Sequence, residues 1–169
     1  ELIVNINASP FYSGKRDYRE KMIATRAADN EVFVAHLNIV GGQDELVFDG
    51  ASLVCDMAGE PVARGPAFRD SLITADLDID AVFRSRLRDP RPRKEDATIL
   101  REIGNSKVIH VSDHQPRERP PLAETSLAPT MDKVEGVYNA LVLGTKDYLR
   151  KSGFTKALIG LSGGVDSAL

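Results

Sequence analysis

The residues best suited to chemistry lie near the end of the sequence, in Gly160-Leu161-Ser162-Gly163-Gly164-Val165-Asp166-Ser167. The apolar residues 157–159 just before them predict a buried strand, and the residues after Gly164 predict the start of a helix. Gly163 and Gly164 lack Cβ atoms and can adopt positive φ, so the backbone there can come close to a ligand. Backbone N–H groups at a helix start have no helical partner and attract anions. This stretch therefore favours a phosphate-binding loop.

Three polar side chains in the stretch bear on what the loop would hold. Ser162 and Ser167 can donate hydroxyl hydrogen bonds to phosphate oxygens. Asp166 would repel a bare phosphate, so we expect it to cap the helix or to bind Mg²⁺. The stretch lacks the Gly-Lys-Ser/Thr of a Walker A loop and the G-x-G-x-x-G of a dinucleotide-binding turn. The alternative is a strand-to-helix turn whose glycines serve only backbone geometry.

The overall composition excludes several classes of protein. The chain has 169 residues, of which 42% are hydrophobic and 28% charged, with a formal net charge of −3. That mild acidity argues against a general nucleic-acid binder, and no apolar run approaches the roughly 18–20 residues that cross a bilayer. The single cysteine, Cys55, excludes an intrachain disulfide and fits a reducing compartment. We therefore expect a cytoplasmic protein without nucleic-acid or membrane partners.

The first half of the sequence predicts one helix among several strands. Residues 15–29 have a helical pattern surrounded by charges, and Asn30 would close the helix. Its apolar face would be formed by Tyr18, Met22, Ile23 and Ala27. Strands, the first of them buried, are predicted over 2–7, 31–40, 51–56 and 71–78. With a turn at 41–44, this pattern indicates an α/β or α+β fold with some antiparallel pairing.

The second half changes in character after residue 84. Residues 84–94 are basic and contain two prolines but no aromatic residue, which favours a solvated face or linker over a nucleic-acid patch. Four more prolines mark 113–130 as an interdomain linker. Thr130 would then cap a helix whose apolar residues recur at helical spacing over 134–149, and Gly153 would end it. We interpret this helix as the beginning of a second, α/β domain.

Both ends of the sequence lead us to expect more chain. Glu1 passes directly into a predicted core strand, and Leu169 stops about one turn into the helix after the glycine loop. We therefore expect a segment of a longer enzyme. Its predicted parts are a first domain over 1–112, a linker over 113–130 and the start of a second domain over 131–169.

Two separated parts of the sequence resemble known families. The stretches 3–11, 14–15 and 40–50 resemble the C-terminal half of a nitrilase-like, or carbon–nitrogen hydrolase, domain. The stretches 137–145 and 160–167 resemble the opening of an NAD synthetase domain, which is one of the N-type ATP pyrophosphatases. A nitrilase-like domain ahead of this loop is similar to the glutamine-dependent NAD synthetase family. The resemblance implies an α/β fold: half of a four-layer sandwich, then the start of a Rossmann-like domain.

The resemblance implies a ligase that takes its nitrogen from glutamine. In this family the first domain hydrolyses glutamine with a Cys nucleophile, a Glu base and a Lys that stabilises the oxyanion. The second domain uses ATP and Mg²⁺ to adenylate nicotinic acid adenine dinucleotide, and ammonia then displaces AMP to give NAD⁺. The loop 160–167 would bind ATP, with Asp166 as a candidate Mg²⁺ ligand. A homo-oligomer is also expected.

The resemblance places no catalytic residue within this sequence, because the family's triad precedes the strand that matches residues 2–7. Cys55 does not match the nucleophile and is expected to be a small buried hydrophobe. Ser9 and Lys15 match the residues that hold the glutamine substrate, the Lys15 cation meeting its α-carboxylate. Lys15 does not match the catalytic lysine. The alternative is that Ser9 caps a turn before Pro10 while Lys15 is solvated.

Other readings of the sequence carry less support. His110 and His114 flank the start of the predicted linker and have no third ligand in view, so we do not expect a zinc site. Two other functions stay open: another ATP-pyrophosphatase amidotransferase, or a non-catalytic interaction module. The glutaminase domains of GMP and asparagine synthetases have other folds, which residues 1–82 do not resemble. A Cys followed by an acidic residue shortly before residue 1 would favour the enzyme over the module.

Overall fold

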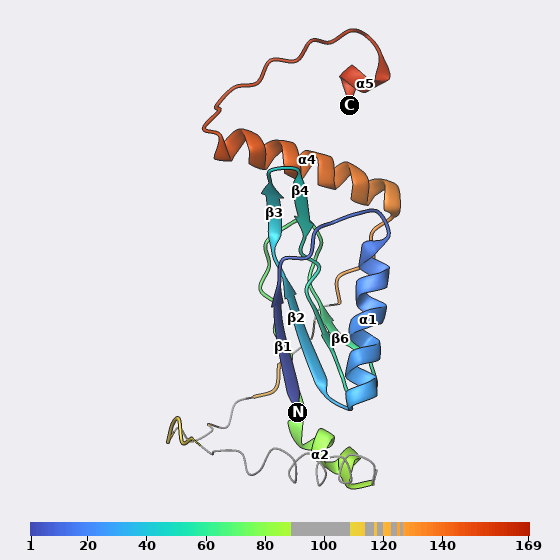
Figure 1. Cartoon of the computed structure of the whole chain (residues 1–169), viewed down its shortest axis with the longest axis vertical. Helices are drawn as coiled ribbons and strands as arrows, with labels where there is room; N and C mark the ends of the chain where they lie inside the picture. Colours follow the sequence, from blue (N-terminus) through green and yellow to red (C-terminus); the bar gives the residue numbers. More distant parts are fainter. Residues whose placement is uncertain (89–108, 114–116, 118–119, 123–124, 126) are drawn as a thin grey trace, which may run out of the picture.

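The structure of the chain, a computed structural model, describes residues 1–88, 109–113, 117, 120–122, 125 and 127–169 (Figure 1). It begins with strand β1 (Leu2–Asn7), helix α1 (Lys15–Asn30) and strand β2 (Phe33–Asn38). β1 and β2 pair in parallel, from Leu2 opposite Phe33 to Asn7 opposite Asn38. Parallel neighbours need a crossover connection, and α1 supplies it. The helix predicted over 15–29 is confirmed.

The sheet continues with two antiparallel strands. β5 (Leu53–Cys55) pairs with β2, and β6 (Pro61–Arg64) pairs with β5, which gives the order β1-β2-β5-β6. The chain between β2 and β5 forms a separate hairpin of β3 (Val40–Gln43) and β4 (Leu46–Asp49). The turn predicted at 41–44 is therefore misplaced. Gly41 and Gly42 pair with β4, and the hairpin turns just beyond them. These glycines allow a helix later in the chain to pack closely on the hairpin and are not needed for a turn.

The described core lies between α1 and the sheet. Its buried apolar residues are Ile23, Ala27, Val32, Val34, Leu53 and Cys55. Tyr18 and Met22, predicted on the buried helix face, are 65% and 43% exposed. Arg19, predicted among the surface charges, is instead buried four residues before Ile23. The buried face of α1 is thus turned from Tyr18 toward Arg19.

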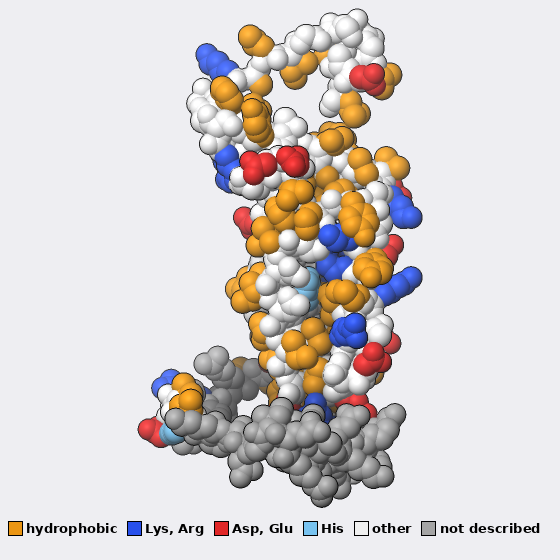
Figure 2. Space-filling model, in the orientation of Figure 1, with side chains coloured by type: hydrophobic (Ala, Val, Ile, Leu, Met, Phe, Trp, Pro, Cys, Tyr) orange, Lys and Arg blue, Asp and Glu red, His pale blue; other side chains and the backbone are white. Residues whose placement is uncertain are grey.

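Two strand predictions differ from the structure. β1 is a strand but is not buried: Val4 and Ile6 are 62% and 77% exposed, because β1 lies at the edge of the described sheet. Hydrophobic side chains are accordingly visible over the sheet in Figure 2. Residues 71–78 form no strand, since a strand needs a neighbour for its backbone hydrogen bonds and no described strand pairs with them. Helix α2 (Ile79–Arg88) follows and contains the first part of the basic run, whose residues 89–94 lie outside the described ranges.

The last part of the chain returns to the sheet before its long helix. Leu127 forms a parallel bridge with Arg64 of β6, so the end of the predicted linker lies along that strand. Helix α4 (Lys133–Lys151) then crosses the end of the β3–β4 hairpin, and the short helix α5 (Val165–Ala168) follows (Figure 1). The cap of α4 is Asp132, whose carboxylate accepts a 2.9 Å hydrogen bond from Val134 N–H, and not Thr130 as predicted.

The end of α4 agrees with the sequence. Gly153, with φ +77, follows the C-cap residue Ser152, as the pattern predicted. Within the part of the chain that the structure describes, no helix combines the length and apolar character needed to cross a membrane.

Candidate functional site

The predicted phosphate loop is closed on itself by its two serines. The N–H of Ser162 donates to Ser167 Oγ at 3.1 Å, and the two hydroxyl oxygens lie 2.9 Å apart. Ser167 Oγ donates to the carbonyl of Gly164 at 3.0 Å, so Ser162 is the donor between the two hydroxyls. Gly163 has φ +85, as predicted, and a Cβ added there would meet no atom within 4 Å. The loop is therefore a compact turn with open space beside Gly163.

One detail of the loop prediction, the strand before it, is wrong, and the structure narrows two others. Residues 157–159 form no strand, and Leu158 and Ile159 are exposed, because none of the described strands pairs with them. Gly164 does not use positive φ: it is the N-cap of α5, with φ −88. Asp166 does not cap the helix but lies exposed in its first turn. Its carboxylate is thereby left available to solvent or a ligand.

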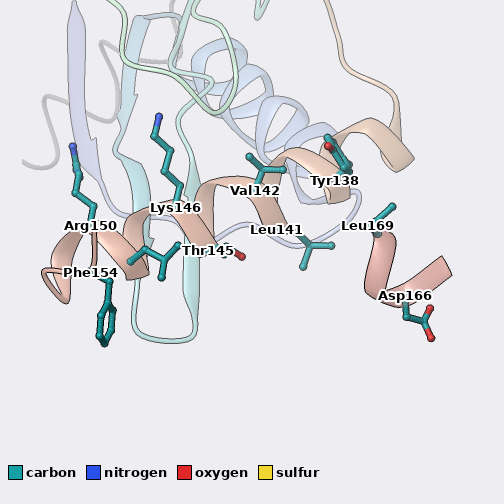
Figure 3. Close-up of a pocket in the computed structure, with 10 residues that line it drawn as sticks. Tyr138, Leu141, Val142, Thr145, Lys146, Arg150, Phe154, Asp166 and Leu169 are labelled. Carbon is teal, nitrogen blue, oxygen red and sulfur yellow. The ribbon is translucent and has the colours of Figure 1, made fainter. Parts of the chain in front are cut away.

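The apolar side of α4 lines an open groove and does not face a core (Figure 3). The groove has a volume of about 660 Å³. Its lining is completed by Phe154 just beyond α4, by Asp166 in α5 and by Leu169 after α5. Tyr138 and Leu141 on α4 are 50% and 57% exposed. The apolar spacing predicted the helix correctly but not which face it buries.

The opposite face of α4 packs on the β3–β4 hairpin through small residues and one buried acid. A Cβ on Gly42 would lie 3.0 Å from the Cα of Gly144, so the two backbones approach closely. The carboxylate of Asp147, a residue that is 6% exposed, accepts a 2.8 Å hydrogen bond from Gly42 N–H. Lys151 Nζ donates to the carbonyl of Gly42 at 2.6 Å. The sequence signal for this face is the four-residue spacing of Gly136, Ala140 and Gly144, which is less conspicuous than the larger apolar residues on the other side of the helix.

The structure places the two predicted glutamine-binding residues at either end of the loop between β1 and α1. Ser9 is half-buried, and within the described chain its hydroxyl forms no hydrogen bond. Lys15 begins α1, and its Nζ lies 5.1 Å from the ring centroid of Tyr12. No hydrogen bond joins Ser9 to Lys15 among the described residues. Their polar groups are therefore free of each other.

Sequence reasoning missed a buried polar network behind Ser9. Arg19 donates to both carboxylate oxygens of Asp49, at 3.1 and 2.8 Å, and these residues are 3% and 1% exposed. Asn38 Nδ2 donates to Asp49 Oδ1 at 3.2 Å, and Ser9 N–H donates to Asn38 Oδ1 at 2.7 Å. The signal lay in α1, where Arg19 stands at helical spacing from the buried residue Ile23. The network links α1, β4 and β2 to the loop that carries Ser9.

Cys55 is the small buried hydrophobe that the sequence predicted. It lies in β5 with no exposed surface. Burial, with a smaller contribution from Glu20, raises the pKa of its thiol to about 11. A nucleophilic cysteine needs a lowered pKa and access to its substrate, and Cys55 has neither.

The histidines offer no metal centre in the described part of the chain. His36 is buried in β2 with both ring nitrogens unpaired. Its pKa is lowered by burial and, to a smaller extent, by the Arg19 charge, so it is neutral at pH 7. His110 Nε2 lies 3.1 Å from a carboxylate oxygen of Asp113, whereas His114 lies outside the described residues. Among the described residues no group of three or more His, Cys, Asp or Glu could hold a metal ion.

Comparisons with known proteins match two separate parts of the chain. A carbon–nitrogen hydrolase family model matches residues 1–86, and an NAD synthase family model matches residues 137–169. The curated glutamine-dependent NAD(+) synthetase of Thermotoga maritima is 42% identical over 99% of this chain, and that of Aquifex aeolicus is 40% identical over 99%. This chain covers 28% of the length of each of these relatives.

A solved structure agrees with the sequence comparisons. The glutamine-dependent NAD+ synthetase of Acinetobacter baumannii, solved with adenosine diphosphate, superposes with a TM-score of 0.69 at 28% identity. The superposition covers 99% of this chain and 25% of that one. The chain is thus similar to these synthetases across both matched segments. Because the carbon–nitrogen hydrolase match spans just over half of the residues, the chain belongs to the carbon–nitrogen hydrolase family.

Proposed function

We propose that this chain is the part of a glutamine-dependent NAD⁺ synthetase that joins its glutaminase domain to its synthetase domain. The observation that carries the proposal is the order of the two family matches, residues 1–86 and then 137–169, within one chain. The relatives that are 40–42% identical over nearly the whole chain are both glutamine-dependent NAD(+) synthetases. The domain division at 1–112, 113–130 and 131–169 belongs to this proposal.

In the proposed reaction glutamine is hydrolysed to glutamate and ammonia. ATP adenylates the carboxylate of nicotinic acid adenine dinucleotide with release of pyrophosphate, and ammonia then displaces AMP to form the amide of NAD⁺. Ser9 and Lys15 would hold glutamine. The Ser9 hydroxyl would form a hydrogen bond with it, and the Lys15 ammonium group would pair with its α-carboxylate. The uncommitted Ser9 hydroxyl and the cation of the half-buried Lys15 support this role. We place no nucleophile in this chain, since its one cysteine is a buried thiol with a raised pKa.

The loop 160–167 would bind the phosphates of ATP. Two features of the residues fit this role: the positive φ of Gly163 and the open space where its Cβ would stand. The NAD synthase match over 137–169 supports it, as does the relative solved with adenosine diphosphate. Asp166 offers an exposed carboxylate, and Mg²⁺ is commonly held by one or two carboxylates together with substrate phosphates. When bound, the ion would neutralise phosphate charge. We also propose that the protein is cytoplasmic and forms a homo-oligomer.

Steady-state NAD⁺ production by the complete polypeptide that contains this chain tests the function. We expect synthesis from ATP and nicotinic acid adenine dinucleotide with either glutamine or ammonium as the nitrogen source. Xanthosine monophosphate and aspartate, in place of the dinucleotide, distinguish the related amidotransferases and should give no product. Absence of NAD⁺ with both nitrogen sources would refute the proposal.

A further inference from the structure

One buried side chain holds the backbone of Ser9 by both of its polar atoms. Asn38, at the end of β2, is 4% exposed. Its Oδ1 accepts a hydrogen bond from Ser9 N–H at 2.7 Å, and its Nδ2 donates to the Ser9 carbonyl at 3.2 Å. The pairing of β1 with β2 ends at Asn7 opposite Asn38. The Asn38 amide therefore takes the place of a strand partner for Ser9, the second residue beyond β1.

The orientation of that amide is fixed by a carboxylate. Nδ2 of Asn38 also donates to Asp49 Oδ1 at 3.2 Å, and Arg19 holds both oxygens of Asp49 from α1. Turning the amide over would place its carbonyl against the carboxylate and its NH₂ group against the Ser9 N–H. The amide carbonyl would also face the Ser9 carbonyl, so three favourable contacts would become repulsive, and in a buried site such losses are large. The network therefore permits one orientation of Asn38 and one position of the Ser9 backbone.

We propose that Asn38 is a positioning residue for glutamine: it sets where the Ser9 hydroxyl lies without touching the substrate. The inference rests on the proposed function, because it takes Ser9 as the residue that binds glutamine. Asn38 occupies the N–H and the carbonyl of Ser9, so the hydroxyl is the polar group of Ser9 left for a ligand. Removing the Asn38 amide keeps the Ser9 hydroxyl but lets it move. The hydrogen bond from that hydroxyl to glutamine, which depends on its position, is then weakened.

The test compares Asn38→Ala with the wild type in the complete enzyme, with glutamine and with ammonium as nitrogen sources. We expect the KM for glutamine to rise roughly two- to tenfold, and by no more than it rises in Ser9→Ala, because the change acts through the Ser9 hydroxyl. The kcat with ammonium should stay within about twofold, since ATP chemistry does not pass through Ser9. Asn30→Ala is the matched control. Asn30 is an exposed asparagine whose Nδ2 donates to the Arg26 carbonyl at the end of α1, and its removal should change neither value.

A double-mutant cycle separates positioning from a general folding role. If Asn38 acts through Ser9, then Ser9→Ala combined with Asn38→Ala should be no worse for glutamine than the more damaging single change. Asn38→Ser, too short to reach both Ser9 atoms, replaces Asn38→Ala should that variant unfold. An unchanged KM for glutamine, additive effects in the cycle, or equal losses with both nitrogen sources would each overturn the inference. A wild type inactive with both nitrogen sources would overturn the proposed function and this inference with it.

Discussion

The buried carboxylate of Asp147 in α4 accepts a 2.8 Å hydrogen bond from the backbone N–H of Gly42 in β3. Lys151, one helical turn further on, donates to the carbonyl of the same glycine at 2.6 Å. Gly42 lies in the segment that matches the carbon–nitrogen hydrolase model, and Asp147 lies in the segment that matches the NAD synthase model. Two hydrogen bonds to the backbone of Gly42 thus connect the two matched segments.

Asp147→Ala should destabilise the packing of α4 on the hairpin by about 1–3 kcal/mol, because it leaves a buried N–H of Gly42 without a partner. Urea unfolding of the chain, followed by circular dichroism, measures the change. Asp29→Ala, which removes an exposed acid from the end of α1, is the matched control and should stay within about 0.5 kcal/mol of the wild type. Equal stability of the two variants would contradict the role given to Asp147.

Two glycines of α4 should respond differently to the same substitution. Gly136→Ala gains helix propensity and brings its Cβ to an ordinary 3.8 Å from Phe11, so it should stabilise by up to about 1 kcal/mol. Gly144→Ala gains the same propensity but places its Cβ 3.1 Å from Val47 Cγ2, where the hairpin has to give way. We expect Gly144→Ala to be the less stable of the two in thermal unfolding. Equal stabilisation would show that the close approach of helix and hairpin is not restrictive.

Gly163 and Gly164 should not be equivalent in the proposed ATP loop. Gly163 has φ +85, where an L-residue costs roughly 1–2 kcal/mol, whereas Gly164 has φ −88, which any residue can adopt. Gly163→Ala should therefore raise the KM for ATP about tenfold in ammonium-driven NAD⁺ synthesis, and Gly164→Ala should raise it less. The reverse order in the complete enzyme would show that the loop binds ATP in another conformation.

Lys15→Ala should affect only the supply of nitrogen from glutamine. A charged hydrogen bond to the substrate is worth about 1.5–3 kcal/mol, so the KM for glutamine should rise roughly 10- to 100-fold. Ser9→Ala removes a neutral hydrogen bond and should cost less, about 0.5–1.5 kcal/mol. Steady-state NAD⁺ production with each nitrogen source is the measurement. If ammonium-driven synthesis fell in parallel, neither residue would belong to a glutamine site.

Cys55 should resist alkylation in the folded chain. With its pKa raised to about 11 by burial, only about one thiol in a thousand is ionised at pH 8, and the side chain has no exposed surface. Raising the pH toward the pKa increases the thiolate fraction, and unfolding in urea restores both an ordinary pKa and access. Mass spectrometry after iodoacetamide treatment, with and without urea, measures the difference. Rapid labelling of the folded chain at pH 8 would contradict this placement.

Local sequence patterns predicted the helices better than the strands. The start of α1, its length, and the glycine after α4 follow from residues near in sequence, and these predictions are confirmed. Strands depend on distant partners, which is why 71–78 and 157–159 failed although their composition suits a strand. The exposed edge position of β1 likewise depends on sheet order, which residues 2–7 alone do not encode.

The candidate site shows the same division. The positive φ at Gly163 and the buried Cys55 could be predicted, since each follows from one residue and its neighbours. The contact of Arg19 with Asp49 could not, because it joins residues thirty positions apart and uses charges that ordinarily face solvent. The role of Asn38 became visible only once β2, β4 and the loop after β1 had been placed together.

Helix α4 holds the hairpin through backbone atoms of Gly42, and Lys151 Nζ adds a 3.2 Å hydrogen bond to the side chain of Gln43. Asp147 and Lys151 bind peptide atoms that every residue except proline provides, while the close approach of Gly144 limits the bulk allowed at position 42. The neighbouring positions 43–46 are exposed and carry no limit on bulk, although Asp44, with φ +52, favours Asp, Asn or Gly at that position. Substitutions at the hairpin tip should therefore cost little stability, provided that position 42 stays small. The packing between the two segments can then be kept while the surrounding sequence changes.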